Sequence, residues 1–352
     1  MLENFKDKRV FITGSTGFKG SWLSYILKLS GAKVMGYALD PISSRSHYND
    51  LKLKDKIVQI KGDIRDRDKL MSTMMDFKPD YVFHLAAQAL VRPSYDDPFN
   101  TFETNVLGSV NLLDSVLATP SVRSLVYITS DKCYENNEWI WGYRENDKLG
   151  GRDPYSASKA AAELVFSSYL QSFISKNKKL GAASVRAGNV IGGGDWAIDR
   201  IVPDCVKSIA NNVPIILRNP QATRPWQHVL EPLSGYLLLA LNLYDNPKSF
   251  SGSWNFGPST FEIATVGDVA YSMVKYFNKG SVVNEGNIGQ PHEAGLLQLN
   301  CDKAHQKLKW KPTWGLKKTL NVTADWYKRV LDGEKVSNVT QEQVYEYFGG
   351  IK

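Results

Sequence analysis

Short runs of β-branched and aromatic residues alternate with helical patterns along the first half of the chain, and this alternation is what most restricts its fold. A long helix is expected over about residues 100–117. Five runs typical of buried strands occupy residues 10–13, 33–39, 57–60, 81–85 and 125–129. Because strands separated by helices connect as parallel βαβ units, the pattern predicts a doubly wound α/β fold with a parallel sheet covered on both faces.

A glycine-rich loop follows the first expected strand. Gly14, Gly17 and Gly20 have the spacing G-x-x-G-x-x-G, whereas the usual dinucleotide fingerprint is G-x-G-x-x-G. Glycines in such a loop allow a tight turn and bring backbone N–H groups close to a pyrophosphate, which the following helix N-terminus also favours. Its place after the first strand predicts a nicotinamide dinucleotide cofactor. An NTPase is disfavoured, since the chain has no Lys-Ser/Thr pair at P-loop spacing.

Two acidic residues bear on the choice of cofactor. Asp40 lies about twenty positions beyond the loop, where a carboxylate usually holds the adenosine ribose hydroxyls, and this favours NAD over NADP. Alternatively Asp40 only opens a turn, and Arg45 contacts a 2′-phosphate instead. Asp63 lies where the adenine amino group could be recognised, or it caps the next helix.

Beyond Arg186 glycines and prolines break the sequence into shorter elements. We therefore expect an NAD-binding Rossmann domain over residues 1–187 and a smaller α/β domain over 188–352 that mainly binds substrate, with later segments returning to the first domain. Lys and Arg outnumber Asp and Glu by 43 to 36, but the surplus is spread along the chain, so no nucleic-acid partner is expected.

A cytoplasmic location is expected from the cysteines and the apolar segments. Cys133, Cys205 and Cys301 have no CxxC spacing and read as three thiols. The charged N-terminus is unlike a signal peptide, and the apolar run 236–241 is much shorter than the ~18–20 residues of a membrane span, so no membrane partner is expected.

Tyr155 and Lys159 are four positions apart, on one face of an expected helix. A free tyrosine has a pKa of about 10, and a neighbouring cation is expected to bring it towards about 7, where the phenolate can act as a base. The YxxxK pattern alone is common in surface helices. Together with the glycine loop and with Ser130 after the fifth strand it indicates a redox active site, because doubly wound sheets bind ligands at the carboxyl ends of their strands.

Asp131 and Lys132 follow Ser130 directly and add two titratable groups at the strand end. An acid beside a hydride-transfer site suggests chemistry beyond oxidation, such as the expulsion of a hydroxyl group. The alternative is that Asp131 caps the following loop and that Lys132 is a solvated charge. Charges at a buried strand end are costly, which favours the functional interpretation.

These motifs resemble those of the extended short-chain dehydrogenase/reductases that modify nucleotide sugars, and most closely the CDP-glucose 4,6-dehydratases. Sister dehydratases generally carry Asp-Glu where this chain has Asp131-Lys132, so the lysine points to the CDP-sugar branch. Ser15 and Ser130 stand where His and Thr are expected. The resemblance is carried by residues 14–22, 84–95, 130–155, 186–204 and 218–229.

The resemblance implies an NAD-dependent hydro-lyase that converts CDP-D-glucose to CDP-4-keto-6-deoxy-D-glucose. Tyr155 would take the O4 proton while C4 gives a hydride to NAD, with Ser130 hydrogen-bonded to O4 and Lys159 tuning the tyrosine. Asp131 would protonate the leaving C6 hydroxyl, after which the hydride returns to C6. The base for the C5 proton stays open between Lys132, which must be neutral to act, and either Glu135 or an ordered water.

The resemblance also implies two sets of binding residues. Arginines suit bidentate contacts with a diphosphate, and an indole either stacks on the cytosine or packs in a loop. The cofactor set is Gly14, Thr16, Gly17, Phe18, Lys19, Gly20, Asp40, Asp63, Ile64, Leu85, Ala86, Ala87, Gln88, Tyr155 and Lys159. The substrate set is Asn189, Asp195, Trp196, Arg200, Arg218, Arg224 and Trp226.

Two other functions are compatible with parts of these patterns. A nucleotide-sugar 4-epimerase shares Tyr155 and Lys159 but does not need Asp131, and a redox-silent NAD-binding regulator would typically lose the Tyr-Lys pair. No metal is expected, because His228 and His292 lack partners at ligand spacing. Helices near residues 100–117 and 155–169 resemble a pair that forms a four-helix interface in this family, which implies a homodimer or homotetramer.

Overall fold

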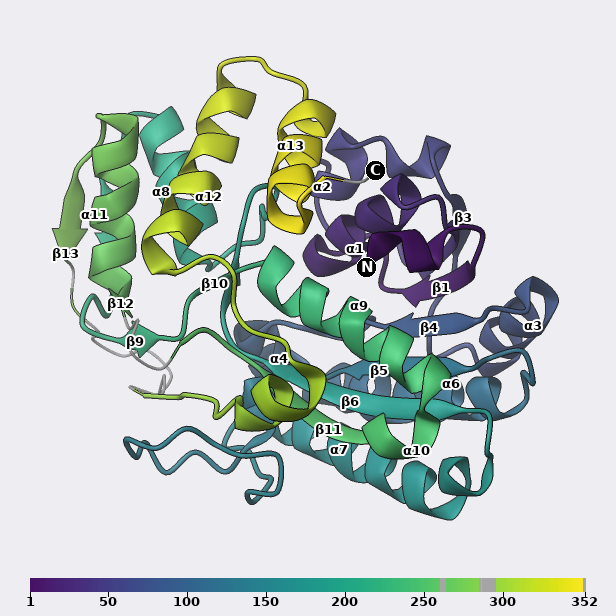
Figure 1. The fold of residues 1–352 in the computed structure, drawn as a ribbon. Helices are drawn as coiled ribbons and strands as arrows, with labels where there is room; N and C mark the ends of the chain where they lie inside the picture. Colours follow the sequence, from purple (N-terminus) through teal and green to yellow (C-terminus); the bar gives the residue numbers. More distant parts are fainter. Residues whose placement is uncertain (260–263, 285, 287–295, 351–352) are drawn as a thin grey trace.

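The computed structural model describes residues 1–259, 264–284, 286 and 296–350. Its centre is a seven-stranded sheet of order β11-β6-β5-β4-β1-β2-β3 in which every neighbouring pair is parallel (Figure 1). The doubly wound parallel sheet is confirmed, and each of the five expected strands lies within one residue of its expected bounds. The strands are β1 (Arg9–Thr13), β2 (Lys33–Ala38), β3 (Val58–Lys61), β4 (Tyr81–His84), β5 (Ser124–Ile128), β6 (Gly181–Ala187) and β11 (Gly252–Phe256).

Helices cover both faces of this sheet, because the strand side chains are apolar on both sides. In β1, Val10 and Ile12 pack in one core with Trp22, while Phe11 belongs to the core on the opposite face with Leu112. The first core contains side chains of α1 (Phe18–Leu29) and α9 (Leu230–Asp245). The second contains side chains of α3 (Arg67–Phe77), α6 (Gly108–Leu117) and α7 (Pro154–Ser172).

The long helix expected over residues 100–117 is present but divided. It consists of α5 (Pro98–Phe102), a π-helical turn (Glu103–Leu107) and α6. The π turn contains the buried Asn105, whose side chain donates to the carbonyl of Gln88 at 3.0 Å and to Ser158 Oγ at 2.8 Å. A π turn inside an α-helix often lies at a functional site, and here it aims an amide at the segment that follows β4.

The C-terminal half adds three small two-stranded sheets and a group of helices. In Figure 1, α8, α11 and α12 stand together to one side of the large sheet. The helices are α8 (Ile201–Ala210), α11 (Val266–Phe277), α12 (Leu316–Leu331) and α13 (Val336–Phe348). The strand pairs are β7 (Val190–Ile191) with β10 (Gln227–His228), β8 (Ile215–Leu217) with β13 (Val282–Asn284), and β9 (Thr223–Arg224) with β12 (Ala264–Thr265).

Short helical segments complete the described chain, and one of them contacts both the first and the last long helix. The α-helical ones are α2 (His47–Asp50), α4 (Val91–Asp96) and α10 (Pro247–Phe250). The 3₁₀ turns cover Leu2–Phe5, Leu53–Asp55, Asp131–Cys133 and Ile174–Lys176, and a second π turn covers Ala304–Leu308. In α2, His47 stacks on Trp22 at 4.8 Å and contacts Thr340 of α13 at 3.1 Å, which ties the last helix to α1. Among the described residues, no helix has the length and apolar character of a membrane span.

Candidate active site

The segments that follow β1, β4, β5 and β6 lie together at the carboxyl edge of the sheet. β1 and β4 are neighbours there, although β2 and β3 lie between them in the sequence, so the winding of the chain reverses between them. Doubly wound sheets bind their ligands at such a reversal. The glycine loop follows β1, residues 85–88 follow β4, and Ser130 follows β5.

The glycine loop has the shape that a dinucleotide pyrophosphate requires. Gly14 has a φ of 71°, and a Cβ on it would lie 2.6 Å from the backbone nitrogen of Ala86. A Cβ on Gly20 would lie 2.1 Å from the carbonyl oxygen of Gly14. Gly17 precedes α1 with no side-chain cap, so the first N–H groups of a twelve-residue helix are left for an anion. The residues present therefore fit the expected cofactor.

The acidic residues expected at the adenosine end already have cationic partners. Asp40 Oδ2 lies 2.5 Å from Lys61 Nζ on the surface. Arg65 contacts both carboxylate oxygens of Asp63, at 2.6 Å for the shortest pair, and these hydrogen bonds lower the pKa of Asp63. The carboxylate of Asp63 is thus held as an anion, which is the state that accepts hydrogen bonds from an adenine amino group.

The segment after β4 is fixed mainly by side chains from neighbouring elements. The backbone N–H of Ala86 donates to Thr13 Oγ1 at 3.3 Å, and that of Gln88 donates to Asn105 Oδ1 at 2.9 Å. The Gln88 side chain donates to Thr101 Oγ1 at 2.9 Å. Asn105 was not expected from the sequence to take part. A polar residue inside an apolar helical run is the signal that could have identified it.

Asp131 is buried, and its carboxyl group is directed into the protein. Ser130 Oγ donates to Asp131 Oδ1 at 3.0 Å and accepts from the backbone N–H of Lys132 at 3.2 Å. Oδ2 has no hydrogen-bond partner within the described residues, and a Cβ on Gly188 would lie 3.2 Å from it. Burial raises the pKa of Asp131, so this carboxyl keeps its proton to a higher pH than an exposed one. It is therefore suited to donate a proton.

Tyr155 and Lys159 lie on α7 as expected, but the charge of the tyrosine differs from the expectation. A hydrogen bond with Ser130 acts to lower the pKa of Tyr155, yet burial outweighs it and raises the pKa to about 12. The expectation of about 7 with Lys159 as the cause is wrong for this structure. Lys159 is itself buried, and burial together with the charge of Lys19 lowers its pKa to about 8. The protein alone thus holds Tyr155 as a neutral phenol.

Lys19 lies among the catalytic charges, whereas the sequence placed it only with the cofactor. Burial and the charge of Arg200 lower its pKa to about 8, and Asp131 acts in the opposite direction. Arg200 also acts to lower the pKa of Tyr155. Arg200 thus acts on Tyr155, where positive charge favours a phenolate, whereas Lys19 acts on Asp131 and Lys159.

A buried ion pair underlies these residues. Glu163 lies one helical turn beyond Lys159, and its Oε2 is 2.7 Å from Arg186 Nη2, with both side chains at most 3% exposed. Thr129, which precedes Ser130, donates to Glu163 Oε1 at 2.5 Å. The pair thus connects the end of β5 to α7. Glu163 was not expected from the sequence to take part, although its spacing of four from Lys159 places it on the same face of the helix.

The three arginines of the expected substrate set all contact groups of the protein itself. Arg200 Nη1 lies 2.9 Å from Asp195 Oδ2, and Arg218 Nη2 lies 3.0 Å from Asp199 Oδ1. Arg224 donates to the carbonyl of Thr223 at 2.8 Å. Asn189 lies half-buried between β6 and β7, and its carbonyl accepts from the backbone N–H of Gln227 at 3.2 Å.

The two tryptophans expected near the nucleotide base are packed inside the protein. Trp226 is 5% exposed, and its indole N–H donates to the carbonyl of Ala264 at 3.0 Å. Trp196 lies edge-on to Tyr327, and the guanidinium of Arg45 covers it at 3.7 Å from the ring centroid. The structure thus favours the loop-packing alternative for both indoles, and it gives Arg45 a partner other than a 2′-phosphate.

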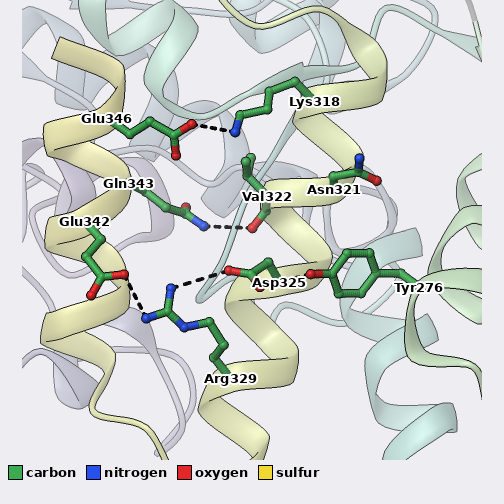
Figure 2. A pocket seen from close by; sticks show the side chains of 9 residues that line it. All are labelled: Tyr276, Lys318, Asn321, Val322, Asp325, Arg329, Glu342, Gln343 and Glu346. Atoms are coloured by element: carbon green, nitrogen blue, oxygen red, sulfur yellow. Dashed lines mark hydrogen bonds and ion pairs between the residues drawn. The ribbon is translucent and has the colours of Figure 1, made fainter. Parts of the chain in front are cut away.

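A cavity of about 230 Å³ lies elsewhere, between α12 and α13 and beside Tyr276 of α11 (Figure 2). Its charged groups are paired, with Arg329 bonded to Glu342 at 2.8 Å and Lys318 to Glu346 at 2.5 Å. None of its lining residues belongs to the expected site. Within the described part of the chain no group of His, Cys, Asp and Glu could hold a metal ion, and His292 lies outside it.

A comparison with known proteins identifies the family. The model of the family described as GDP-mannose 4,6 dehydratase matches residues 11–323. The chain belongs to this dehydratase family. The curated CDP-glucose 4,6-dehydratase of Salmonella typhimurium is 48% identical to it over 98% of each chain. The predicted nucleotide-sugar dehydratase family is thus confirmed.

Solved structures agree with this family assignment at the level of the fold. The UDP-glucose 4-epimerase of Thermus thermophilus, solved in complex with NAD, has a TM-score of 0.77 and 26% identity, covering 91% of this chain and 99% of that one. The dTDP-glucose 4,6-dehydratase of Bacillus anthracis, also in complex with NAD, has a TM-score of 0.76 and 21% identity, covering 92% and 97%. The family thus shares its fold with epimerases, so the active site has to distinguish the two reactions.

Proposed function

We propose that the protein is a CDP-glucose 4,6-dehydratase, which converts CDP-D-glucose to CDP-4-keto-6-deoxy-D-glucose. The observation that carries the proposal is the buried Asp131, whose free oxygen and raised pKa make it a proton donor beside Ser130 and Tyr155. An epimerase has no leaving hydroxyl to protonate and no need of this acid. The 48% identity to a curated CDP-glucose 4,6-dehydratase supports the CDP-sugar as substrate.

Bound NAD supplies a hydride acceptor for C4 and later a hydride donor for C6. Tyr155 accepts the proton of the O4 hydroxyl as a phenolate and so returns to the neutral phenol, while Ser130 turns its hydroxyl from Asp131 to donate a hydrogen bond to O4. The positive charge of Arg200 and the hydrogen bond with Ser130 favour this phenolate. Asp131 then delivers its proton to the departing C6 hydroxyl, so that water leaves rather than hydroxide.

Lys132 is the better candidate for the base that removes the C5 proton. Glu135, the alternative, has its Oε2 2.7 Å from Lys148 Nζ at the surface, and this ion pair holds its carboxylate away from the strand end. Lys132 directly follows Asp131 after the end of β5, and its amine can take the C5 proton once it has lost its own. We therefore assign the C5 proton to Lys132.

A homodimer is the proposed assembly. Large apolar side chains are exposed on α5, the π turn and α7, with Phe99 76%, Leu107 58% and Leu164 62% exposed. An exposed apolar face on helices that also pack together favours a helical contact with a second copy.

The three cysteines are buried free thiols, which supports a reducing compartment such as the cytoplasm.

The test is the product formed by the purified protein from CDP-, UDP-, dTDP- and GDP-glucose. With CDP-glucose, mass spectrometry should show the loss of one water, and another preferred nucleotide would overturn the base assignment. Asp131→Asn should lower kcat roughly 100- to 10,000-fold, the share that general acids usually contribute. A product of unchanged mass with inverted C4, formed equally well by Asp131→Asn, would show an epimerase instead.

A further inference from the structure

Two arginines from distant parts of the chain meet at one carboxylate oxygen. Arg92 Nη1 lies 3.2 Å from Asp199 Oδ1, and Arg218 Nη2 lies 3.0 Å from the same atom. Arg92 belongs to α4, after β4 of the large sheet, whereas Arg218 follows β8 in the C-terminal half. The three side chains are 36%, 37% and 40% exposed for Arg92, Arg218 and Asp199, so a ligand can reach all of them.

This cluster adjoins the catalytic residues on two sides. Asp199 immediately precedes Arg200, whose positive charge acts on the hydroxyl of Tyr155. On the other side, Ser94 of α4 lies two residues beyond Arg92, and its Oγ accepts the backbone N–H of Tyr155 at 3.2 Å. The two arginines therefore lie at the edge of the candidate active site and not on a remote surface.

The contact with Asp199 is one that a ligand could replace. Exposed ion pairs contribute little to stability, because water competes for both charges. Asp199 also has a φ of 60°, in the left-handed region that residues other than glycine seldom adopt. Asp199 thus gains little from a position that restricts its backbone, and two guanidinium groups share one of its carboxylate oxygens.

We propose that Arg92 and Arg218 form a clamp for the diphosphate of the nucleotide sugar, which Asp199 occupies until the substrate displaces it. The inference rests on the proposed function for the chemical class of its ligand. A guanidinium binds phosphate oxygens through two parallel hydrogen bonds, and a diphosphate brings two negative charges where the carboxylate has one. Arg92 thereby joins Arg218 as a substrate-binding residue, although no expected site residue lies on α4.

If the diphosphate displaces Asp199, substitutions of Arg92 and of Asp199 should change the affinity for CDP in opposite directions. Asp199→Asn removes the competing charge and keeps the size of the side chain, so CDP should bind about two- to five-fold more tightly, as expected for the loss of a weak ion pair. Arg92→Met keeps an unbranched apolar stem but loses the phosphate contact, so CDP should bind roughly 10- to 100-fold more weakly. Cytidine, which has no phosphate, should bind all variants with the same affinity.

Isothermal titration of the full-length chain with CDP and with cytidine tests the clamp. Glu346→Gln is the matched control, because it removes an exposed carboxylate that pairs with Lys318 at 2.5 Å in the separate cavity (Figure 2). It should leave the affinity for CDP unchanged. Unchanged or weaker CDP binding by Asp199→Asn overturns the role of Asp199, and unchanged binding by Arg92→Met overturns the clamp.

The result also separates the clamp from the identity of the substrate. If the parent protein prefers UDP, dTDP or GDP to CDP, the proposed base is wrong, and the same variants titrated with the preferred diphosphate still decide the clamp. If no nucleoside diphosphate binds the parent protein, both the clamp and the proposed function are overturned.

Discussion

The buried pair of Glu163 and Arg186 offers the sharpest test of how the active site is held in place. We consider Glu163→Gln, which keeps the shape of the side chain but removes its charge. Arg186 then stays buried without a counter-ion, while its other hydrogen bonds, to the Tyr134 hydroxyl at 2.7 Å and to Ser253 Oγ at 3.1 Å, remain. The substitution therefore isolates the loss of one charge at a site that water does not reach.

The expected cost follows from this burial. Breaking one partner of a buried ion pair costs ~3–5 kcal/mol, because the remaining charge is uncompensated. An unfolding entropy of about 2.1 cal/mol/K per residue gives roughly 0.7 kcal/mol/K for a chain of 352 residues. The melting temperature should therefore fall by about 4–7 °C, measured by calorimetry or by circular dichroism.

The double substitution Glu163→Leu, Arg186→Met separates stability from positioning. Replacing both charges by apolar groups often leaves the free energy of unfolding unchanged. Thr129, which loses its bond to Glu163, still has a partner, since its Oγ1 also bonds the Val185 carbonyl at 3.3 Å. Stability should recover, whereas kcat should stay low with KM unchanged, because the end of β5 is no longer bonded to α7. Recovery of both would show that the pair only stabilises the fold. A single variant as stable as the parent would refute the burial argument.

Two further predictions follow from the site. Because the pKa of Lys159 is about 8, kcat should decline as the pH rises through that value and the lysine loses its charge. In Lys159→Arg the decline should move to higher pH. An unmoved midpoint in the pH–rate profile would contradict this assignment. Gly20→Ala should weaken NAD binding in a fluorescence titration and destabilise the fold by ~1–3 kcal/mol, because the new Cβ would lie 2.1 Å from the Gly14 carbonyl. The control Gly257→Ala, whose nearest neighbour would be at 3.4 Å, should bind NAD normally.

The parts of the fold that were predictable from the sequence are those that local patterns determine. Continuous apolar runs mark the five strands, because strands buried on both faces have no polar side. The glycine loop was identifiable for a similar reason, since Gly14 with its φ of 71° meets a local backbone demand. Tyr155 and Lys159 share one helix, so their spacing alone places them together.

The features that were missed depend on contacts between distant segments. Arg92 and Asp199 are 107 positions apart, and no local pattern pairs them. Trp226 was expected at the substrate from the family resemblance, whereas its buried indole N–H donates to the carbonyl of Ala264, 38 positions away. The pKa of Tyr155 was misjudged because spacing gives the distance to a charge but not the loss of water around the phenol, and that loss is the larger effect here.

Asp63 and Asp131 show why residue type and position are not sufficient to assign a chemical role. Both aspartates follow a strand of the same sheet. Arg65 lowers the pKa of Asp63 and keeps it an anion, whereas burial raises the pKa of Asp131 and favours its acid form. One carboxyl is thus suited to accept hydrogen bonds and the other to give up a proton. The difference comes from a guanidinium two residues away in one case and, in the other, from the packing of the Gly188 segment against the carboxyl. In the proposed mechanism, the step from oxidation to dehydration depends on the burial of this one side chain.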